Sequence, residues 1–413
     1  MALPRICILG LGYIGLPTAG MFAVNGMPVL GVDVNSAVVS QVAKGGVHIA
    51  EPGLRTVIQA AVGSGALRVS ERPEPSDVFI IAVPTPLTAE KRADLSFVEE
   101  ASSMIAPCLA KGNMVIVEST IPPRTTEKTV IPLIERPGLK AGVDFDVVHC
   151  PERVIPGKIL LELVENDRVI GGITAEAARR AEALYRAFVR GKILLTDLVT
   201  AEMVKLVENS FRDVNVAFAN ELSRISAVLG INAREVISLA NHHPRVRILD
   251  PGPGVGGHCI AVDPWFIAEC VPNEARLIRA ARAVNDGMPA FVVDRIIARV
   301  PEKAKVALWG LTYKADVDDL RESPSLEVAR LLREGGFSAG LFDPYVRNAP
   351  EIEVATLEES VKDASLIVLL VGHRDFRFIN PRVVAPLVRE KRLLDVKQFL
   401  DRAEWEAAGF ICH

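Results

Sequence analysis

Short apolar runs alternate with amphipathic stretches in the first part of the chain. The apolar runs cover residues 5–9, 27–32, 77–83, 114–117 and 146–149, and helical patterns lie between them. Continuous apolar runs of this length are typical of strands buried on both faces of a parallel sheet, which helical crossovers connect. The pattern predicts a doubly wound α/β domain.

A glycine motif follows the first apolar run. Gly10, Gly12 and Gly15 occupy the turn between that run and a helical pattern over 16–25. Asp33 ends the second apolar run, about 20 residues after the first glycine. In a dinucleotide-binding unit the glycines admit the pyrophosphate to a helix N-terminus, and the acidic residue accepts the ribose hydroxyls. We expect nucleotide binding here, since a turn that only closes a βαβ unit needs no such acid.

Three later strand ends carry polar or turn residues. These segments are Pro84-Thr85-Pro86, residues 118–120 and residues 150–152. Ligands of doubly wound sheets bind beyond the carboxyl ends of the strands. The segments are candidate walls of a binding site, and plain turns are the alternative.

The middle of the chain is helical. Residues 201–229 contain neither Pro nor Gly and repeat apolar residues at helical intervals, which predicts one long helix between domains. Lys205 and Asn209 stand four residues apart, so they share a face and can reach a common ligand, unless they only face solvent. A second helical stretch is expected over 274–300.

A second α/β unit is expected after residue 304. Its predicted strands and helix cover 305–309, 325–334, 339–342, 366–371 and 393–396. Gly310 and Asp343 echo the first unit, but the other glycines are missing, so we expect a Rossmann-like domain without the dinucleotide fingerprint. The charged loop 314–324 is either a solvated loop or a phosphate clamp, since Arg binds phosphate bidentately and Lys as a point charge.

One cysteine lies in a loop rich in glycine and proline, residues 251–264. The glycines let a bulky ligand approach the backbone, and the prolines stiffen the loop. Such a loop can present Cys259 as a reactive thiol. An incidental buried cysteine is the alternative.

Composition limits the function classes. The 413 residues are too many for one core, so two or three domains are expected. A net charge of -4 gives no general attraction to nucleic acid or anionic membranes. Six dispersed cysteines without a C-x-x-C pair argue against a disulfide framework or zinc site and predict a reducing cytoplasm. Without a signal sequence or a run of ~20 apolar residues, the chain is expected to be soluble.

These motifs, in this order, resemble the nucleotide-sugar 6-dehydrogenases over essentially the whole chain. The similarity lies in 10–15, 118–120, 150–153, Lys205 with Asn209, 256–263 and 314–324. The resemblance implies a four-electron oxidation of a sugar C6 alcohol to a carboxylate with two NAD, through a thiohemiacetal and a thioester on cysteine. A non-catalytic nucleotide-sugar-binding protein and a two-electron hydroxyacid-type dehydrogenase are the alternatives.

The resemblance also implies a role for individual residues. The catalytic group comprises the nucleophile Cys259, Lys205 for the oxyanion, Asn209 and Asp263 to order lysine and water, and Glu152 as a base through water, with Thr120. The implied cofactor-binding residues are Gly10, Gly12, Tyr13, Ile14, Gly15, Asp33, Pro84, Thr85, Thr120 and Arg321. The implied substrate-binding residues are Glu152, Arg153, Val154, Lys205, Asn209, Arg245, Gly256, His258, Lys314 and Lys397.

Substrate and cofactor follow from details of these motifs. Residues 240–246 and 251–266 are most similar to the branch of the family that oxidises UDP-N-acetylmannosamine, which implies a UDP-N-acetylhexosamine substrate. UDP-N-acetylglucosamine or another UDP-hexose is the alternative. Pro156 stands where UDP-glucose dehydrogenases have a second glutamate, which implies a differently shaped sugar pocket. Asp33 would repel a 2′-phosphate and residues 34–36 supply no cation, so NAD is preferred over NADP.

The expected fold is α/β, with two Rossmann-like doubly wound domains joined by a long central helix. The domains are placed at 1–198 for NAD, 199–300 for the central helical region with the cysteine loop, and 301–413 for the UDP-sugar. By resemblance, Arg245 reaches the neighbouring subunit's site, which implies a homodimer or higher homo-oligomer. No metal is expected, because His242 and His243 lack a third ligand at suitable spacing.

Overall fold

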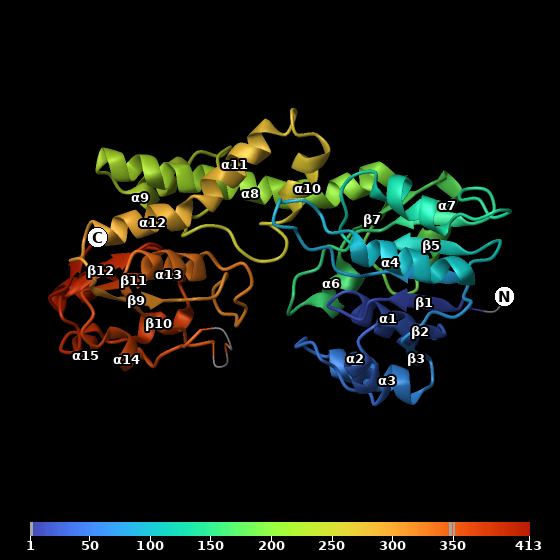
Figure 1. Cartoon of the computed structure of the whole chain (residues 1–413), viewed down its shortest axis with the longest axis horizontal. Helices are drawn as coiled ribbons and strands as arrows, with labels where there is room; N and C mark the ends of the chain where they lie inside the picture. Colours follow the sequence, from blue (N-terminus) through green and yellow to red (C-terminus); the bar gives the residue numbers. More distant parts are fainter. Residues whose placement is uncertain (1–2, 347–348, 350–351) are drawn as a thin grey trace. The chain divides into compact units, whose positions relative to one another are not determined.

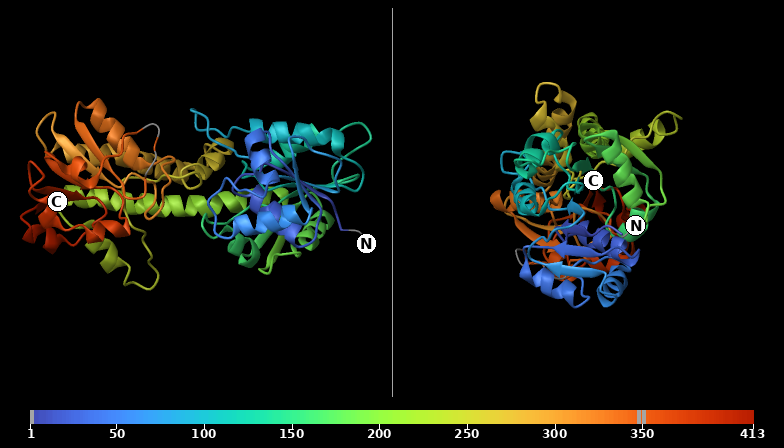
Figure 2. Two further views of the ribbon diagram at one scale, coloured as in Figure 1. Left: turned by 90° about the horizontal axis from the view of Figure 1, so that it is seen from below. Right: turned by 90° about the vertical axis from the view of Figure 1, so that its right-hand side faces the viewer.

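The computed structural model describes residues 3–346, 349 and 352–413. The chain divides into two compact units, residues 1–208 with 265–272 and residues 209–264 with 273–413. Helix α8 (Leu198–Leu229) is continuous, as its sequence without Pro or Gly predicts (Figure 2). Among the described residues, no helix combines the length and apolar character needed to span a membrane.

The N-terminal unit is built on an eight-stranded sheet of order β3-β2-β1-β4-β5-β6-β7-β8. Its strands are β1 (Ile6–Leu9), β2 (Val29–Val32), β3 (Leu67–Ser70), β4 (Val78–Ile81), β5 (Met114–Val117), β6 (Asp146–His149), β7 (Arg168–Gly172) and β8 (Ile193–Asp197). The first six have the strand order of dinucleotide-binding folds, which reverses between β1 and β4. The sheet is not uniformly parallel as expected, because β6 and β7 pair antiparallel.

Helices cover both faces of this sheet (Figure 1). They are α1 (Gly15–Val24), α2 (Ser36–Ala43), α3 (Leu54–Gly63), α4 (Ser96–Ile105), α5 (Ile131–Ile134), α6 (Ile159–Glu165) and α7 (Ala175–Tyr185), with a π-helical turn over Thr126–Val130. Ile6 and Ile8 of β1 belong to one hydrophobic core, whereas Cys7 and Leu9 belong to the other. Because alternate side chains face opposite cores, the whole strand is apolar.

The second unit contains a five-stranded parallel sheet of order β10-β9-β11-β12-β13. Its strands are β9 (Lys305–Trp309), β10 (Ser338–Phe342), β11 (Leu366–Leu369), β12 (Arg392–Asp395) and β13 (Ile411–Cys412). Helices α12 (Met288–Ile297) and α13 (Pro324–Glu334) pack on one face, and α14 (Leu357–Val361), α15 (Pro381–Val384) and α16 (Arg402–Ala407) pack on the other (Figure 1). The unit also contains α9 (Ala233–Ala240) and α11 (Arg276–Asp286), and α10 covers Asp263–Cys270.

The helical stretch expected over 274–300 consists of two helices. Helix α11 ends at Asp286, Gly287 caps it, and α12 begins at Met288. Pro289 lies in the first turn of α12, where its missing N–H and fixed φ are tolerated. The apolar periodicity of the sequence continues across the break between α11 and α12. Only Gly287 and Pro289 indicate that a second helix begins there.

Candidate functional site

The turn after β1 has the geometry of a phosphate-binding turn. Gly10 has φ +89°, and a Cβ there would lie 2.5 Å from the carbonyl oxygen of Ala82. A Cβ on Gly15 would lie 1.8 Å from the carbonyl oxygen of Gly10. A Cβ on Gly12 would meet nothing within 4 Å. The fold itself therefore requires the outer two glycines, whereas Gly12 leaves open space at the N-terminus of α1, where a pyrophosphate binds in such units.

Asp33 is held in position at the end of β2. Its Oδ2 accepts a hydrogen bond from the Leu11 N–H at 2.9 Å, and its Oδ1 accepts one from the Asn35 N–H at 2.9 Å. The side chain is only partly buried, and the following residues 34–36 are exposed and uncharged. A fixed carboxylate without a neighbouring cation in that segment suits the ribose hydroxyls of NAD rather than a 2′-phosphate. Tyr13 is exposed in the turn, beside the partly buried Ile14.

The second unit repeats the hydrogen bonds of this glycine turn and its aspartate. The Gly310 N–H donates to the Phe342 carbonyl at 2.9 Å, as the Gly10 N–H donates to Val32 at 2.8 Å. Asp343 Oδ2 accepts the Leu311 N–H at 2.7 Å, in the manner of Asp33. The two units thus share the backbone geometry of one nucleotide-binding turn.

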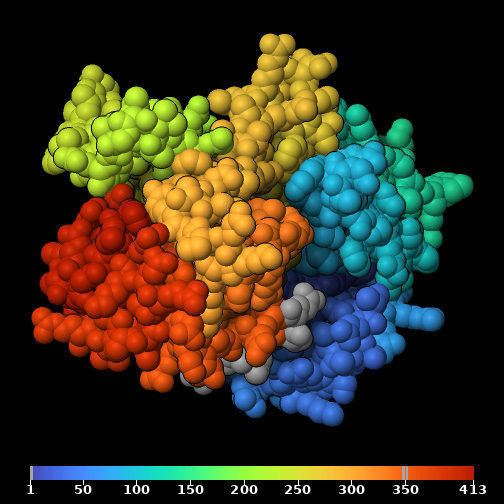
Figure 3. Space-filling view, turned by 60° about the vertical axis from the view of Figure 1, so that its left-hand side comes forward, coloured from blue at the N-terminus to red at the C-terminus, as the bar shows by residue number. Residues whose placement is uncertain are grey.

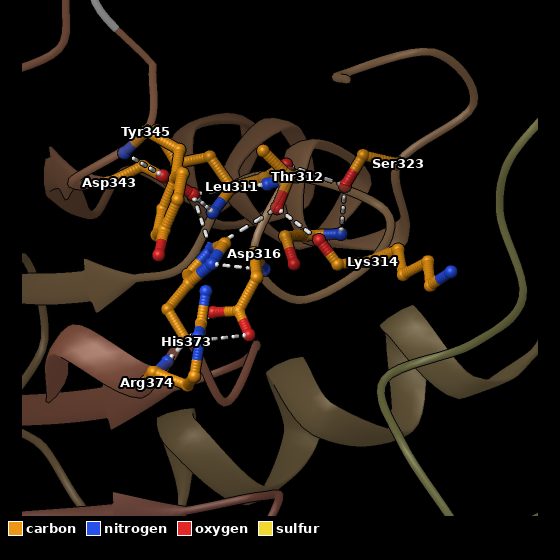
Figure 4. Close-up of polar contacts among 10 residues, drawn as sticks. Leu311, Thr312, Lys314, Asp316, Ser323, Asp343, Tyr345, His373 and Arg374 are labelled. Atoms are coloured by element: carbon orange, nitrogen blue, oxygen red, sulfur yellow. Dashed lines mark hydrogen bonds and ion pairs between the residues drawn. The ribbon is translucent and has the colours of Figure 1, made fainter. Parts of the chain in front are cut away.

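The turn after β9 lacks the open space of the turn after β1. Thr312 follows Leu311 where Gly12 follows Leu11, and the buried His373 lies against the turn after β9 (Figure 4). His373 Nε2 lies 3.0 Å from Asp343 Oδ2, and His373 Nδ1 accepts the Asp316 N–H at 2.9 Å. A Rossmann-like turn without the dinucleotide fingerprint agrees with the interpretation of the sequence.

The strand-end loops after β4 and β5 are fastened to each other. The Ser119 hydroxyl accepts the Val83 N–H at 2.9 Å and donates to the Val83 carbonyl at 2.7 Å. The Thr85 hydroxyl donates to the Thr120 carbonyl at 2.5 Å. Thr85 and Thr120 therefore lie side by side at the carboxyl end of the sheet, next to the exposed Pro84.

The first half of α8 is attached to the loops that follow β5 and β6. The buried Glu202 carboxylate accepts backbone N–H groups of Arg124 at 2.5 Å and Thr126 at 2.9 Å. Glu208 forms an ion pair with Arg153. Lys205 lies between these two anchors and is partly buried. The structure therefore places the predicted lysine on a helix segment that both motif loops hold.

The structure brings Asn209 and Asp263 together. Asn209 Nδ2 donates to Asp263 Oδ2 at 2.5 Å, and both residues are 3% exposed. The Asp263 N–H donates to the Cys259 carbonyl at 2.9 Å. The helix face that carries Asn209 is thereby linked to the turn that carries Cys259.

Cys259 differs from the other cysteines in its surroundings. It is exposed in a turn. Burial raises the pKa of Cys7 to about 12 and that of Cys150 to about 11, and burial also raises the pKa of Cys108, Cys270 and Cys412. Because the thiolate is the nucleophile, burial disfavours Cys7 and Cys150 most strongly as reactive thiols, whereas Cys259 is exposed in the loop that carries the family motif, which makes it the strongest candidate.

The cysteine loop packs closely on the loop 314–324. A Cβ on Gly256 would lie 2.3 Å from the Glu322 carbonyl oxygen, so close packing already requires this glycine. The neighbouring His258 is exposed, and partial burial of its ring, with the Arg321 charge, lowers its pKa. Lys397 Nζ donates to the Pro251 carbonyl at 2.7 Å, so this predicted substrate ligand anchors the loop.

Among the remaining predicted cations, Arg321 lies in the loop 314–324, and its carbonyl accepts the Gly257 N–H at 3.2 Å. Lys314 is exposed, and its side chain extends away from the His373 cluster (Figure 4). Arg321 Nε donates to Asp319 Oδ1 at 2.8 Å. Arg245 is exposed in the segment after α9, and Val154 is partly buried beside Arg153.

Glu152 has partners that sequence reasoning missed. Its Oε2 pairs with Arg168 Nη2 at 2.7 Å, and Arg168 also lies near Glu118, which accepts the Tyr185 hydroxyl at 2.5 Å. Arg168 begins β7, a strand that the sequence reading did not recognise. Glu118 belongs to the segment 118–120, which resembles the family, and that membership was the sequence signal for it.

Comparison with known proteins decides the family. Sequence models of the UDP-glucose/GDP-mannose dehydrogenase family match the chain in three parts, the NAD binding domain at 4–189, the central domain at 199–287 and the UDP binding domain at 307–402. The chain belongs to this family. It is an NAD-dependent dehydrogenase of nucleotide sugars, as the motifs indicated.

Relatives within the family extend over nearly the full chain. The UDP-N-acetyl-D-mannosamine dehydrogenase of Methanocaldococcus jannaschii is 48% identical, with 98% of this chain and 95% of the relative covered. An NDP-N-acetyl-D-galactosaminuronic acid dehydrogenase of Ralstonia nicotianae is 49% identical, with 91% and 92% covered. The solved structure of the UDP-N-acetyl-D-mannosamine dehydrogenase of Pyrococcus horikoshii is 43% identical with a TM-score of 0.91, and 99% and 98% are covered. The predicted α/β fold with Rossmann-like domains is confirmed.

Proposed function

We propose that the chain oxidises UDP-N-acetyl-D-mannosamine at C6 to UDP-N-acetyl-D-mannosaminuronate with two NAD. The observation that carries the chemistry is the buried Asn209–Asp263 hydrogen bond, which joins the lysine-bearing helix to the cysteine turn. A UDP-N-acetyl-D-mannosamine dehydrogenase that is 48% identical to this chain supports the choice of this sugar as the substrate. We assign residues 1–198 to NAD, 301–413 to the UDP-sugar and 199–300 to the region between them.

The first oxidation needs a base and a cation. Glu152 takes up the C6 hydroxyl proton through a water molecule, and the Lys205 ammonium stabilises the developing alkoxide. Asn209 and Asp263 orient the lysine and the water. The turn of Gly10 and Gly12 would hold NAD, which would supply the hydride acceptor for each of the two oxidations at C6.

The second oxidation needs a covalent intermediate. The Cys259 thiolate adds to the aldehyde carbon, and the resulting oxyanion takes a proton to give a thiohemiacetal. Loss of a hydride and a proton converts the thiohemiacetal to a thioester. Water then adds, the thiolate leaves, and the products are the carboxylate and the free enzyme. Covalent capture keeps the aldehyde bound while the reduced cofactor is exchanged.

A panel of UDP-sugars tests this function. We expect NADH formation to be fastest with UDP-N-acetylmannosamine and to give two NADH for each sugar consumed, whereas a two-electron dehydrogenase gives one. Cys259→Ser should abolish carboxylate formation, because the serine hydroxyl is a far weaker nucleophile at neutral pH. Cys270→Ser, at another exposed cysteine, is the matched control and should retain activity. No turnover with any sugar, or full activity of Cys259→Ser, would refute the proposal.

We also propose a homodimer in which Arg245 enters the partner's substrate site. Helices α8 and α9 expose large apolar side chains in the second unit, and this segment lies at the surface (Figure 3). They are Phe211, Phe218, Ile225, Val228, Leu229 and Leu239. Exposed apolar surface of this kind is typical of an interface.

Mixing two inactive variants tests the shared site. Arg245→Ala and Cys259→Ser, each inactive alone, should regain activity when their subunits are exchanged, because the hybrid has one site with both groups. With random pairing, about a quarter of the sites become active. A mixture that stays inactive after verified subunit exchange would place Arg245 in its own subunit's site.

A further inference from the structure

The Arg168 guanidinium on β7 is shared between two buried carboxylates. Its Nη2 lies 2.7 Å from Glu152 Oε2, and its Nη1 lies 3.6 Å from Glu118 Oε1. The side chains of Arg168, Glu118 and Glu152 are 5%, 0% and 7% exposed. The guanidinium also lies over the Tyr185 ring, 4.6 Å from its centroid. One positive charge therefore stands between two acidic groups with little water.

The two carboxyl groups are supported unequally. Both oxygens of Glu152 have partners, since Oε1 accepts the Arg153 N–H at 2.6 Å and Oε2 pairs with Arg168. Glu118 Oε1 accepts the Tyr185 hydroxyl, but Glu118 Oε2 is buried without a hydrogen-bond partner among the described residues. An unpaired buried oxygen penalises the charged form, so Glu118 is the carboxyl group that holds a proton more readily.

The surroundings place the ionisation of Glu118 in the neutral range. Burial raises its pKa to about 7, with the Arg168 charge and the Tyr185 hydroxyl acting to lower it and the Glu152 charge to raise it. The adjacent Cys150 thiol and the Tyr185 hydroxyl stay neutral there, because burial raises their pKa values, that of Cys150 to about 11. Glu118 is therefore the group of this cluster whose charge changes near neutral pH.

We propose that Glu118 is a positioning residue that sets the strength of Glu152 as a base through the shared Arg168. While Glu118 is neutral, the guanidinium charge acts on Glu152 alone and weakens it as a proton acceptor. When Glu118 ionises, a second negative charge competes for the guanidinium, and Glu152 binds a proton more tightly. The inference rests on the proposed role of Glu152 in the oxidation.

The test is the pH dependence of kcat for NADH formation with saturating NAD and UDP-N-acetylmannosamine. For the unsubstituted enzyme we expect kcat to rise through a step near pH 7, where Glu118 ionises because burial raises its pKa to about 7. Glu118→Gln should lack this step and have a kcat about threefold or more lower at alkaline pH, because Glu152 stays the weaker base. Tyr185→Phe removes a donor to ionised Glu118, so it should keep the step but move it to higher pH.

Two controls separate positioning from structure. Asp146 begins β6, at the end of the strand away from the cluster, and pairs with Arg180. Asp146→Asn removes this carboxylate and should leave the step of kcat near pH 7 in place. Infrared difference spectra between acidic and alkaline samples should show a buried carboxylic acid losing its proton in the unsubstituted enzyme but not in Glu118→Gln.

Each outcome decides between the claims. An active enzyme whose step survives in Glu118→Gln overturns this inference and leaves the proposed function intact. A step that moves to lower pH in Tyr185→Phe also overturns the inference. Failure of the unsubstituted enzyme to reduce NAD with any UDP-sugar overturns the proposed function, and the role of Glu118 with it.

Discussion

His149 should make the N-terminal unit sensitive to acid. Its side chain is fully buried in β6, and both ring nitrogens lack a hydrogen-bond partner among the described residues. Burial lowers its pKa from 6.5 to about 3, because the imidazolium form has lost its hydration. The unfolded chain therefore binds a proton below pH 6.5 that the folded unit refuses until about pH 3.

The magnitude follows from this difference in pKa. Stability from neutral His149 is complete above pH 6.5 and is lost as the pH falls toward 3. At about 1.4 kcal/mol for each pH unit, the loss is about 2 kcal/mol at pH 5 relative to pH 8, and about 5 kcal/mol at full extent. His149→Leu removes the titrating group, so the variant should gain about 2 kcal/mol over the unsubstituted protein between these two pH values.

Urea unfolding at pH 8 and pH 5 measures this gain, with hydrogen exchange of peptides that cover β6 as the signal for the N-terminal unit. Glu118 has a raised pKa and acts in the opposite direction, but it is present in both proteins and cancels. His48→Leu, at an exposed histidine of the same unit, is the control, since it removes no buried group. An advantage of His149→Leu that is equal at both pH values would refute the reasoning.

Three further predictions concern the site. Gly12→Ala should fold normally and weaken NAD binding in calorimetry by about tenfold or more, whereas Gly15→Ala should fail to fold stably because its Cβ would lie 1.8 Å from a carbonyl oxygen. Asp33→Asn keeps an acceptor for the Leu11 N–H but removes the negative charge. The ratio of kcat/KM with NADP to kcat/KM with NAD should therefore rise about tenfold. An unchanged ratio would contradict the role of Asp33. Asn209→Leu removes one hydrogen bond to the buried Asp263 carboxylate and should cost about 1–3 kcal/mol in urea unfolding, with a fall in kcat at similar KM; unchanged stability and kcat would argue against a role for this pair.

Much of the fold could be predicted because its signals are local. The strands at 114–117, 146–149 and 305–309 coincide with the predicted apolar runs, since a strand buried on both faces is mostly apolar. Strands β3, β7, β8 and β13 were missed. Strand β3 (Leu67–Ser70) alternates apolar and polar residues and is partly exposed, so it carries no continuous apolar run.

The site was predictable where a motif combines chain geometry with chemistry. The glycine turn and Asp33 belong to one βαβ unit, and the family resemblance named both Asn209 and Asp263, whose hydrogen bond only the structure shows. The shared Arg168 was not predictable, because it begins an antiparallel strand whose neighbours the sequence does not specify. The anchoring role of Lys397 was missed for the same reason, since its partner Pro251 lies far away in the chain.

The sequence by itself determined the glycine turns after β1 and β9, the long helix and the family, because short-range geometry and residue chemistry specify each of them. Tertiary structure alone decided which ionisable groups share a buried environment. His149 lost its hydration, and Glu118 came to share one guanidinium with Glu152, only when distant strands paired. Desolvation and charge competition act across space rather than along the chain, so no local pattern announces them.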